Sequence, residues 1–177
     1  MSLVEVYLGL GSNTERNKHL CAGLDALHAL FGPLDCSPVF ESEAVGIRSA
    51  CFYNMVVRIK TSLPLSELVC QLKHIEKLNG RFAAPRKSLS LDIDVLLYGQ
   101  HVGVFGSVCL PRAEVLKNAF VLWPLALLAP ELLHPVAQRS FFELWQAAQI
   151  EQKLWPVAFH WQGQPLTPQT MLKSSVV

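Results

Sequence analysis

The segment SLSLDIDVLLYG, residues 88 to 99, is the most strand-like apolar run of the chain, and it carries two aspartates. In an extended strand, residues i and i+2 lie on the same face, so Asp92 and Asp94 share one face of this strand. Burial of an unpaired carboxylate costs several kcal/mol, and a second carboxylate beside it adds to that cost. The segment can therefore be buried only if something neutralises the pair. The apolar residues are expected to divide between the two faces, with Leu96 and Tyr98 beside the aspartates and Leu91, Ile93, Val95 and Leu97 opposite.

Magnesium is one way to neutralise the two carboxylates. Mg²⁺ takes oxygen ligands and needs only one or two carboxylates when it also binds substrate phosphates. Two such ions about 3.5–4 Å apart are typical of phosphoryl-type transfer. The alternative is a carboxylate pair that faces solvent or an arginine, because structural ion pairs resemble functional sites. Three basic residues just upstream, Arg81, Arg86 and Lys87, are either a solvated surface cluster or, next to the aspartates, a phosphate clamp.

The predicted elements up to the aspartate strand follow a β-α-β-β-α-β order. This order predicts a ferredoxin-like α+β sandwich, a mainly antiparallel sheet with helices on both faces. Such a fold hosts many functions and does not decide the chemistry. We expect one domain over residues 1–155 and a C-terminal tail over 156–177. The expected strands are 4–11, 37–43, 51–61, 91–99 and 102–110, and the expected helices are 17–31, 64–79, 112–118, 120–128 and 140–149.

The composition argues against several classes of protein. The formal net charge is +1, so no global field attracts nucleic acid or an anionic membrane. The longest apolar run, 120–130, is too short to span a membrane. The N-terminus lacks the features of a signal peptide, and the five scattered cysteines have no metal or redox spacing. We therefore expect a cytoplasmic protein that acts on small molecules, binds neither nucleic acid nor membrane, and is a monomer or a weak homodimer.

Two further motifs each have a structural and a functional interpretation. YLGLGSN, residues 7–13, is a strand that runs into a glycine turn, and it lacks the Gly-Lys-Ser/Thr ending of a P-loop. Phe52 and Asn54 share the less apolar face of the third predicted strand. An asparagine there can be a satisfied core residue, or its amide can bind the edge of a heterocycle that stacks on the ring.

Four segments together resemble one enzyme family. YLGLGSN, FYNMVV, LDIDVLLYG and FVLWPLALLAPELLHP are similar in order and spacing to 6-hydroxymethyl-7,8-dihydropterin pyrophosphokinase, an enzyme of folate synthesis, over about residues 3–136. The resemblance implies a ferredoxin-like sandwich that binds MgATP and a reduced pterin. The hydroxymethyl oxygen of the pterin would attack the β-phosphorus of ATP, so that pyrophosphate is transferred and AMP leaves. Positioning and charge neutralisation do most of the work in such chemistry.

The resemblance also implies roles for individual residues. The magnesium ligands of the family fall on Asp92 and Asp94, which would hold two ions. The pterin would lie between Phe52 and Phe120, with Asn54 on its edge and further contacts near Ser42 and Val45. On the nucleotide side, Glu76 and Arg81 match family positions, which implies an ATP contact from Glu76 and a catalytic contact to the phosphates from Arg81. The basic cluster beside the aspartates and the charge of Arg112 further predict ATP contacts from Lys87 and Arg112 and a catalytic contact from Arg86.

The chain departs from the family pattern around the ATP phosphates. The family arginine three residues before the first magnesium aspartate aligns with Leu89. A family histidine aligns with Arg112, and an arginine that follows it aligns with Asn118. The segment after Arg81 is short and lacks the tryptophan that closes the family's pterin site. The resemblance therefore implies that the pterin pocket and the metal strand are retained, whereas the phosphate clamp has diverged.

Three functions are compatible with these residues. The main hypothesis is a magnesium-dependent ATP:pterin diphosphotransferase. One alternative is a diverged paralogue that binds a pterin with weak or no pyrophosphokinase activity. The other is a related transferase that acts on another pterin.

Overall fold

The centre of the fold is strand β1 (Val4–Ser12), which is hydrogen-bonded along both of its edges. It pairs antiparallel with β4 (Phe52–Thr61) on one side and with β5 (Asp92–Tyr98) on the other. Beyond β4 lie β3 (Phe40–Ser42) and β8 (Leu154–Pro156), so the strand order is β5-β1-β4-β3-β8; the short β2 (Asp35–Cys36) also pairs with β4. The structure is a computed structural model and describes residues 2–43, 50–80 and 90–172.

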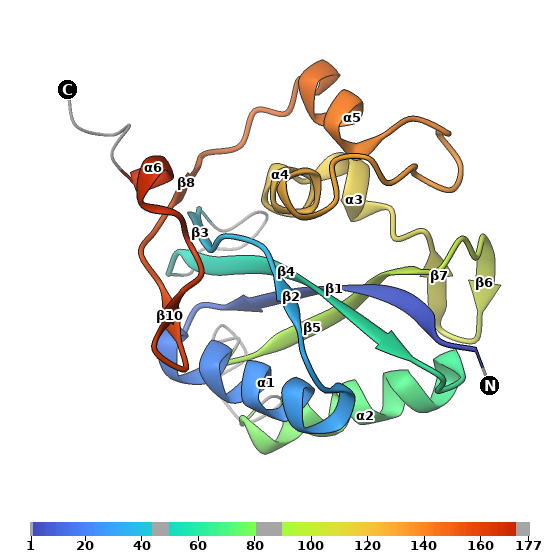
Figure 1. The fold of residues 1–177 in the computed structure, drawn as a ribbon, viewed down its shortest axis with the longest axis horizontal. Coiled ribbons are helices and arrows are strands. Elements are labelled where there is room, and N and C mark those ends of the chain that lie inside the picture. Colours follow the sequence, from blue (N-terminus) through green and yellow to red (C-terminus); the bar gives the residue numbers. More distant parts are fainter. Residues whose placement is uncertain (1, 44–49, 81–89, 173–177) are drawn as a thin grey trace.

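Helices cover both faces of this sheet (Figure 1). One face packs on α1 (Arg16–Phe31) and α2 (Leu65–Leu78), and the other on α4 (Ala119–Leu128), α5 (Phe141–Ala147) and the short α3 (Glu114–Lys117). Each face has its own hydrophobic core: Leu8 of β1 packs toward α1 and α2, and its neighbour Tyr7 packs toward α4. Among the described residues, no helix combines the length and the apolar character that a membrane span requires.

The strand order and the two helix layers confirm the predicted ferredoxin-like sandwich. The second strand is divided and begins earlier than expected: β2 lies before residue 37, and only residues 40–42 of the expected range 37–43 form β3. Pro38 has no N–H to donate, and the hydroxyl of Ser37 accepts the hydrogen bond of Val56 N at 2.8 Å. The expected strand 102–110 is the hairpin of β6 (Gly103–Phe105) and β7 (Val108–Leu110), which turns at Gly106 with a φ of 64° that favours glycine.

A β-bulge in β5 overturns part of the predicted facing of this strand. Val95 lies opposite Leu8 and Leu97 lies opposite Tyr7, which leaves Leu96 as the extra residue. The aspartates share a face with Leu96, as predicted, but beyond the bulge the faces exchange. Leu97 therefore packs in the α4 and α5 core beside Leu96, and Tyr98 packs in the α1 and α2 core. The predicted sides of Leu97 and Tyr98 were wrong because an inserted residue shifts the alternation by one.

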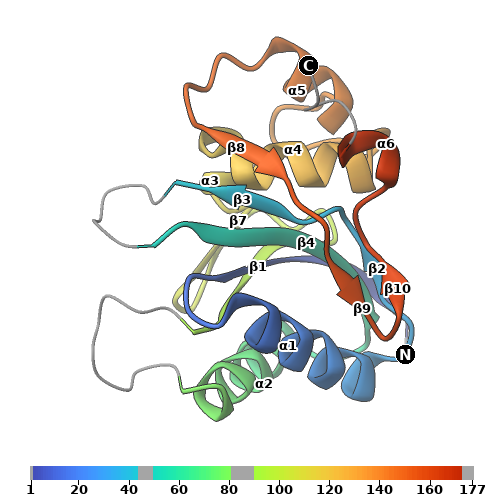
Figure 2. The same cartoon turned by 90° about the vertical axis from the view of Figure 1, so that its left-hand side faces the viewer.

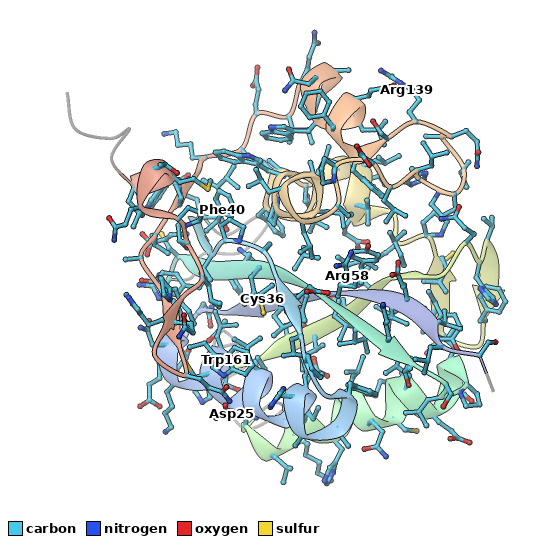
Figure 3. All side chains as sticks on the ribbon, in the orientation of Figure 1. Asp25, Cys36, Phe40, Arg58, Arg139 and Trp161 are labelled. Carbon is cyan, nitrogen blue, oxygen red and sulfur yellow. The ribbon has the colours of Figure 1, made fainter. Side chains whose placement is uncertain are left out.

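The described part of the predicted tail packs against the domain. The expected boundary at residues 155 and 156 falls inside β8, which pairs with β3. After β8, Phe159 is fully buried in the α1 and α2 core. Figure 2 shows the hairpin of β9 (His160–Trp161) and β10 (Gln164–Pro165) beside α1, before the short α6 (Gln169–Leu172). Trp161 Nε1 donates to Asp25 Oδ1 of α1 at 2.9 Å (Figure 3).

The tail also completes the hydrogen bonding of the divided strand. Val39 N, between β2 and β3, donates to Thr167 Oγ1 at 3.0 Å, and both residues are buried. Thr167→Val would leave this backbone donor without its acceptor, so we expect the free energy of unfolding to fall by about 1–3 kcal/mol. Urea titration followed by circular dichroism measures the change. Thr170→Val, the same replacement at an exposed site, is the control; equal stability of the two variants would contradict the prediction.

Candidate active site

Two cavities lie on either side of the aspartate strand's first residues. The first, of about 240 Å³, lies on the α4 side of the sheet. The second, of about 290 Å³, lies between α2 and the start of β7, and its walls include Val69, Lys73 and Ser107. Asp92, Asp94 and Arg112 line both cavities, so the carboxylate pair forms the partition between them. The first cavity brings together seven residues that the sequence singled out: Ser42, Phe52, Asn54, Asp92, Asp94, Arg112 and Phe120.

The carboxylate pair is half-buried and carries excess negative charge. Burial and the neighbouring Asp92 raise the pKa of Asp94 to about 7, although Arg112 acts in the opposite direction. Arg112 Nη2 lies 3.6 Å from Asp94 Oδ1, and its Nε lies 3.2 Å from Glu114 Oε2, so it divides its charge between two carboxylates. Arg112 therefore neutralises the aspartate pair only in part, so the alternative in which an arginine compensates the pair is only partly realised. The pair still favours the approach of a cation.

The oxygen donors of this pair fit a magnesium ion. Among the described residues, no group of three or more His, Cys, Asp or Glu side chains is arranged to hold a metal. Mg²⁺ does not need such a group, because it keeps several water ligands and takes the rest from one or two carboxylates and substrate phosphates. Two carboxylates at the junction of two cavities match that requirement.

Glu76 of α2 supports the aspartate strand from the second cavity. It is buried, and its Oε2 accepts a hydrogen bond from Ile93 N at 2.9 Å. β5 is an edge strand, so this backbone N–H would otherwise lack an acceptor. Glu76, which the sequence predicted to contact ATP, therefore also sets the position of the backbone between the two aspartates.

The polar wall of the first cavity is built from neighbouring strands. Asn54 Nδ2 of β4 donates to Ser42 Oγ of β3 at 2.8 Å, and both residues are buried. The amide oxygen lies over Gly11 of β1, where an added Cβ would be 3.0 Å from it. The hydrogen bond to Ser42 holds the Asn54 amide in place between β3 and β1. Phe52 and Phe120, both half-buried, line the same cavity from β4 and α4.

The sequence did not identify Arg16, which anchors the strands of this wall. Its Nη1 bonds to Glu41 Oε2 at 2.7 Å and to the carbonyl of Cys51 at 3.1 Å. Its guanidinium carbon lies 3.9 Å from the centroid of the Tyr53 ring. Arg16 thereby ties the start of α1 to β3 and β4. A single basic residue at a helix start gives no signal of such long-range contacts.

Four predicted site residues lie outside the described part of the chain. They are Val45, which was expected at the pterin, and Arg81, Arg86 and Lys87, which were expected at the phosphates. Leu89, where the family arginine aligns, also lies outside it. Their predicted roles stay predictions.

A comparison with protein families agrees with this arrangement. Residues 7–130 match the family model described as 7,8-dihydro-6-hydroxymethylpterin-pyrophosphokinase, and this range contains all seven predicted residues of the first cavity. The chain belongs to this family. The predicted family is therefore confirmed, and with it the class of enzyme, a pyrophosphokinase.

Curated pyrophosphokinases of this family cover most of the chain. The 2-amino-4-hydroxy-6-hydroxymethyldihydropteridine pyrophosphokinase of Aquifex aeolicus is 33% identical over 147 residues, which are 80% of this chain and 90% of that protein. The Pseudomonas aeruginosa protein of the same name is 35% identical over 73% of this chain and 83% of its own length. The folic acid synthesis protein fol1 of Pneumocystis carinii is 34% identical, but the match spans only 20% of its length.

Solved structures support the fold of the family. The HPPK-DHPS protein of Plasmodium falciparum superimposes on 81% of this chain with a TM-score of 0.65 at 15% sequence identity. The match covers 43% of that longer protein. At this identity the likeness concerns the fold alone. It agrees with the antiparallel sheet between two helix layers.

Proposed function

We propose that this pyrophosphokinase transfers pyrophosphate from MgATP to 6-hydroxymethyl-7,8-dihydropterin. The hydroxymethyl oxygen forms a bond to the β-phosphorus and gives up its proton, the bond from that phosphorus to the α,β-bridging oxygen breaks, and AMP leaves. The observation that carries the proposal is the carboxylate pair at the junction of two cavities. One cavity can hold the acceptor and the other the nucleotide, so that their reacting ends meet beside Asp92 and Asp94.

The first cavity suits a flat heterocycle with polar edges. Phe52 and Phe120 offer apolar ring surfaces, and Asn54 offers an amide that a hydrogen bond to Ser42 holds in place. Aromatic side chains and a few oriented polar groups are typical of small-molecule sites. The pterin ring would stack in this cavity with its edge on Asn54 and Ser42. Its hydroxymethyl group would then point toward the aspartates.

The second cavity suits the nucleotide. Val69 and Val108 give it an apolar wall, and Lys73 lies at its margin. Asp92 and Asp94 would hold two magnesium ions, which would neutralise the charge on the phosphates and on the transferred group. Arg112 would contact the phosphates from its place in both cavities. Arg81, Arg86 and Lys87 would add positive charge around the phosphates.

The departures at Leu89, Arg112 and Asn118 change how the phosphates are held. Removal of one donor to a developing charge typically costs about 3–4 kcal/mol of transition-state stabilisation. A weaker clamp therefore predicts slower turnover than that of relatives that keep the arginines. It does not predict loss of pterin binding, because the first cavity keeps its rings and its amide. We further propose that the protein works in the cytoplasm as a monomer or a weak homodimer.

AMP formation tests the proposed function directly. The purified protein is incubated with ATP, magnesium and 6-hydroxymethyl-7,8-dihydropterin, and AMP is quantified by chromatography. We expect AMP only when pterin and magnesium are both present. A folded sample that binds the pterin but forms no AMP would reject the proposal and support the pterin-binding paralogue. AMP formed with a different pterin only would support the related transferase.

Gly11 gives a test of the pterin cavity that leaves every residue of the metal strand in place, although Gly11 pairs with Asp92 across the sheet. A Cβ at Gly11 would lie 3.0 Å from Asn54 Oδ1, so Gly11→Ala should displace the amide. We expect about a tenfold rise in the KM for the pterin, because a misplaced hydrogen-bonding group loses a contact of roughly 1.4 kcal/mol. The matched comparison is Gly9→Ala, which lines the same cavity and pairs with the same strand, but whose added Cβ would meet the Leu96 side chain at 3.3 Å and not the Asn54 amide. Equal KM values for the two variants would contradict the assignment.

A further inference from the structure

The side chain of Gln152 connects two walls of the first cavity. Gln152 immediately precedes the segment that pairs with β3, where Lys153 O accepts from Glu43 N at 3.3 Å. From there its amide reaches the start of α4. Gln152 Oε1 accepts a hydrogen bond from Ala119 N at 2.8 Å, and Gln152 Nε2 donates to Asn118 Oδ1 at 3.0 Å.

These two hydrogen bonds define the orientation of both amides. The backbone N–H of Ala119 can only donate, so the group of Gln152 that faces it must be the oxygen. The NH₂ group of Gln152 then faces Asn118 and can only donate, so Asn118 must present its oxygen to Gln152. The NH₂ group of Asn118, a residue that lines the first cavity, is the other end of this amide and points away from Gln152.

Asn118 is unusual for an asparagine at its position. It is the N-cap residue of α4, where an asparagine side chain normally accepts a hydrogen bond from the first turn of its own helix. The Asn118 side chain caps nothing, and Gln152 serves the first helical N–H instead. Asn118 is also the residue that aligns with a family arginine. An arginine offers donors in every orientation, whereas an amide offers a donor only if it is turned correctly.

We propose that Gln152 is a positioning residue that holds the NH₂ group of Asn118 toward the first cavity as a neutral donor to phosphate oxygens. The inference rests on the proposed function, since the ligand group is the part of the polyphosphate that would reach the junction of the two cavities, where Asp92, Asp94 and Arg112 line the first cavity together with Asn118. Asn118 makes the contact, and Gln152 acts through it. The diverged clamp thus replaces a charged donor by an amide that a second amide orients.

The variant Gln152→Glu removes the group that orients the Asn118 amide but keeps the hydrogen bond to the start of α4. A glutamate can still accept from Ala119 N, and its charge at a helix N-terminus is favourable, so the fold should be retained. It cannot donate to Asn118, whose amide should turn its NH₂ group toward the introduced carboxylate and its oxygen toward the cavity. We expect the Kd of a non-hydrolysable MgATP analogue, measured by calorimetry, to rise about tenfold, with pterin affinity within about twofold of the parent. The control is Gln149→Glu, which adds the same charge at an exposed position.

A double-mutant cycle with Asn118→Ala shows whether Gln152 acts by positioning the Asn118 amide or by supporting the wall of the first cavity in general. If Gln152 acts through the Asn118 amide, Gln152→Glu adds no further loss once that amide is gone. An equal additional loss in the Asn118→Ala background would overturn the inference, and so would unchanged analogue affinity of folded Gln152→Glu. The cycle measures binding of the analogue and does not depend on activity. If the parent forms no AMP but the four Kd values follow this cycle, the proposed function is rejected and the inference is retained. A parent that does not bind the analogue overturns both.

Discussion

Asp94→Asn is expected to abolish magnesium-dependent pyrophosphoryl transfer and to make the ligand-free protein more stable. Asparagine keeps the shape of the side chain but removes the charge that would bind the metal. Loss of an electrostatic stabiliser at the reacting phosphates should lower kcat/KM by about a hundredfold or more. Asp92→Asn should act in the same way, because both carboxylates lie at the junction of the two cavities.

The gain in stability follows from the electrostatics of the pair. Burial and Asp92 raise the pKa of Asp94 to about 7, so the folded protein without metal holds its charged form at a cost. The variant does not pay that cost, so its free energy of unfolding should be higher by on the order of 1 kcal/mol, which is roughly 2–4 °C in Tm. The gain is kept this small because the pair is partly exposed and solvent screens its charge. Magnesium with an ATP analogue should raise the Tm of the parent and leave that of the variant unchanged.

Thermal unfolding and AMP formation are to be measured on the same samples. Asp35→Asn is the control, since it also removes a carboxylate from a strand of the sheet but leaves the cavities intact. Its activity should be that of the parent. If Asp94→Asn keeps activity within a fewfold of the parent, the two aspartates do not hold the metal, and the proposed mechanism loses its basis.

Asn54→Leu is expected to weaken pterin binding by roughly tenfold to a hundredfold, since the polar edge of the heterocycle would then be buried without a partner. Leucine has a similar size, so the packing between Ser42 and Gly11 should be retained. Affinity for a MgATP analogue should stay within about twofold of the parent, because Asn54 would contact the ring of the pterin and not the phosphates at the junction of the cavities. Calorimetric titration with each ligand separates the two effects.

Ser42→Ala completes this test. It removes only the acceptor that holds the Asn54 amide, so a smaller loss of about fivefold is expected. If Asn54→Leu binds the pterin as the parent does, the alternative interpretation is correct, and Asn54 is a satisfied core residue. If both ligands lose affinity equally, the variant has disturbed the sheet and not the pterin site.

Several features of the site could be predicted because their signals are local. The period of two along β4 placed Phe52 and Asn54 on one face, and in the structure both line the first cavity. The same period placed Asp92 and Asp94 together on β5, and the apolar surroundings implied a compensating charge. The four segments of family resemblance extended these assignments to Phe120 and Arg112. Each of these inferences used residues close together in sequence or a contiguous motif.

Other features could not be predicted because they depend on contacts between distant residues. The bulge at Leu96 results from pairing with β1, and it reversed the expected sides of Leu97 and Tyr98. Arg16 contacts the carbonyl of Cys51, 35 residues away, and no periodicity marks it. The described tail residues gave only a weak pattern, yet they occupy the core through Phe159 and complete the sheet through Thr167.

The sequence by itself determined the order of the main strands and helices up to the aspartate strand, the carboxylate pair and the family, because backbone periodicity and short motifs are properties of neighbouring residues. Only the tertiary structure decided that the aspartates separate two cavities, that Glu76 supports their strand, and that Gln152 orients Asn118. The two hydrogen bonds involved join residues that are 17 and 34 positions apart in the chain. A hydrogen bond between such residues exists only once the sheet and its helices have brought them within reach.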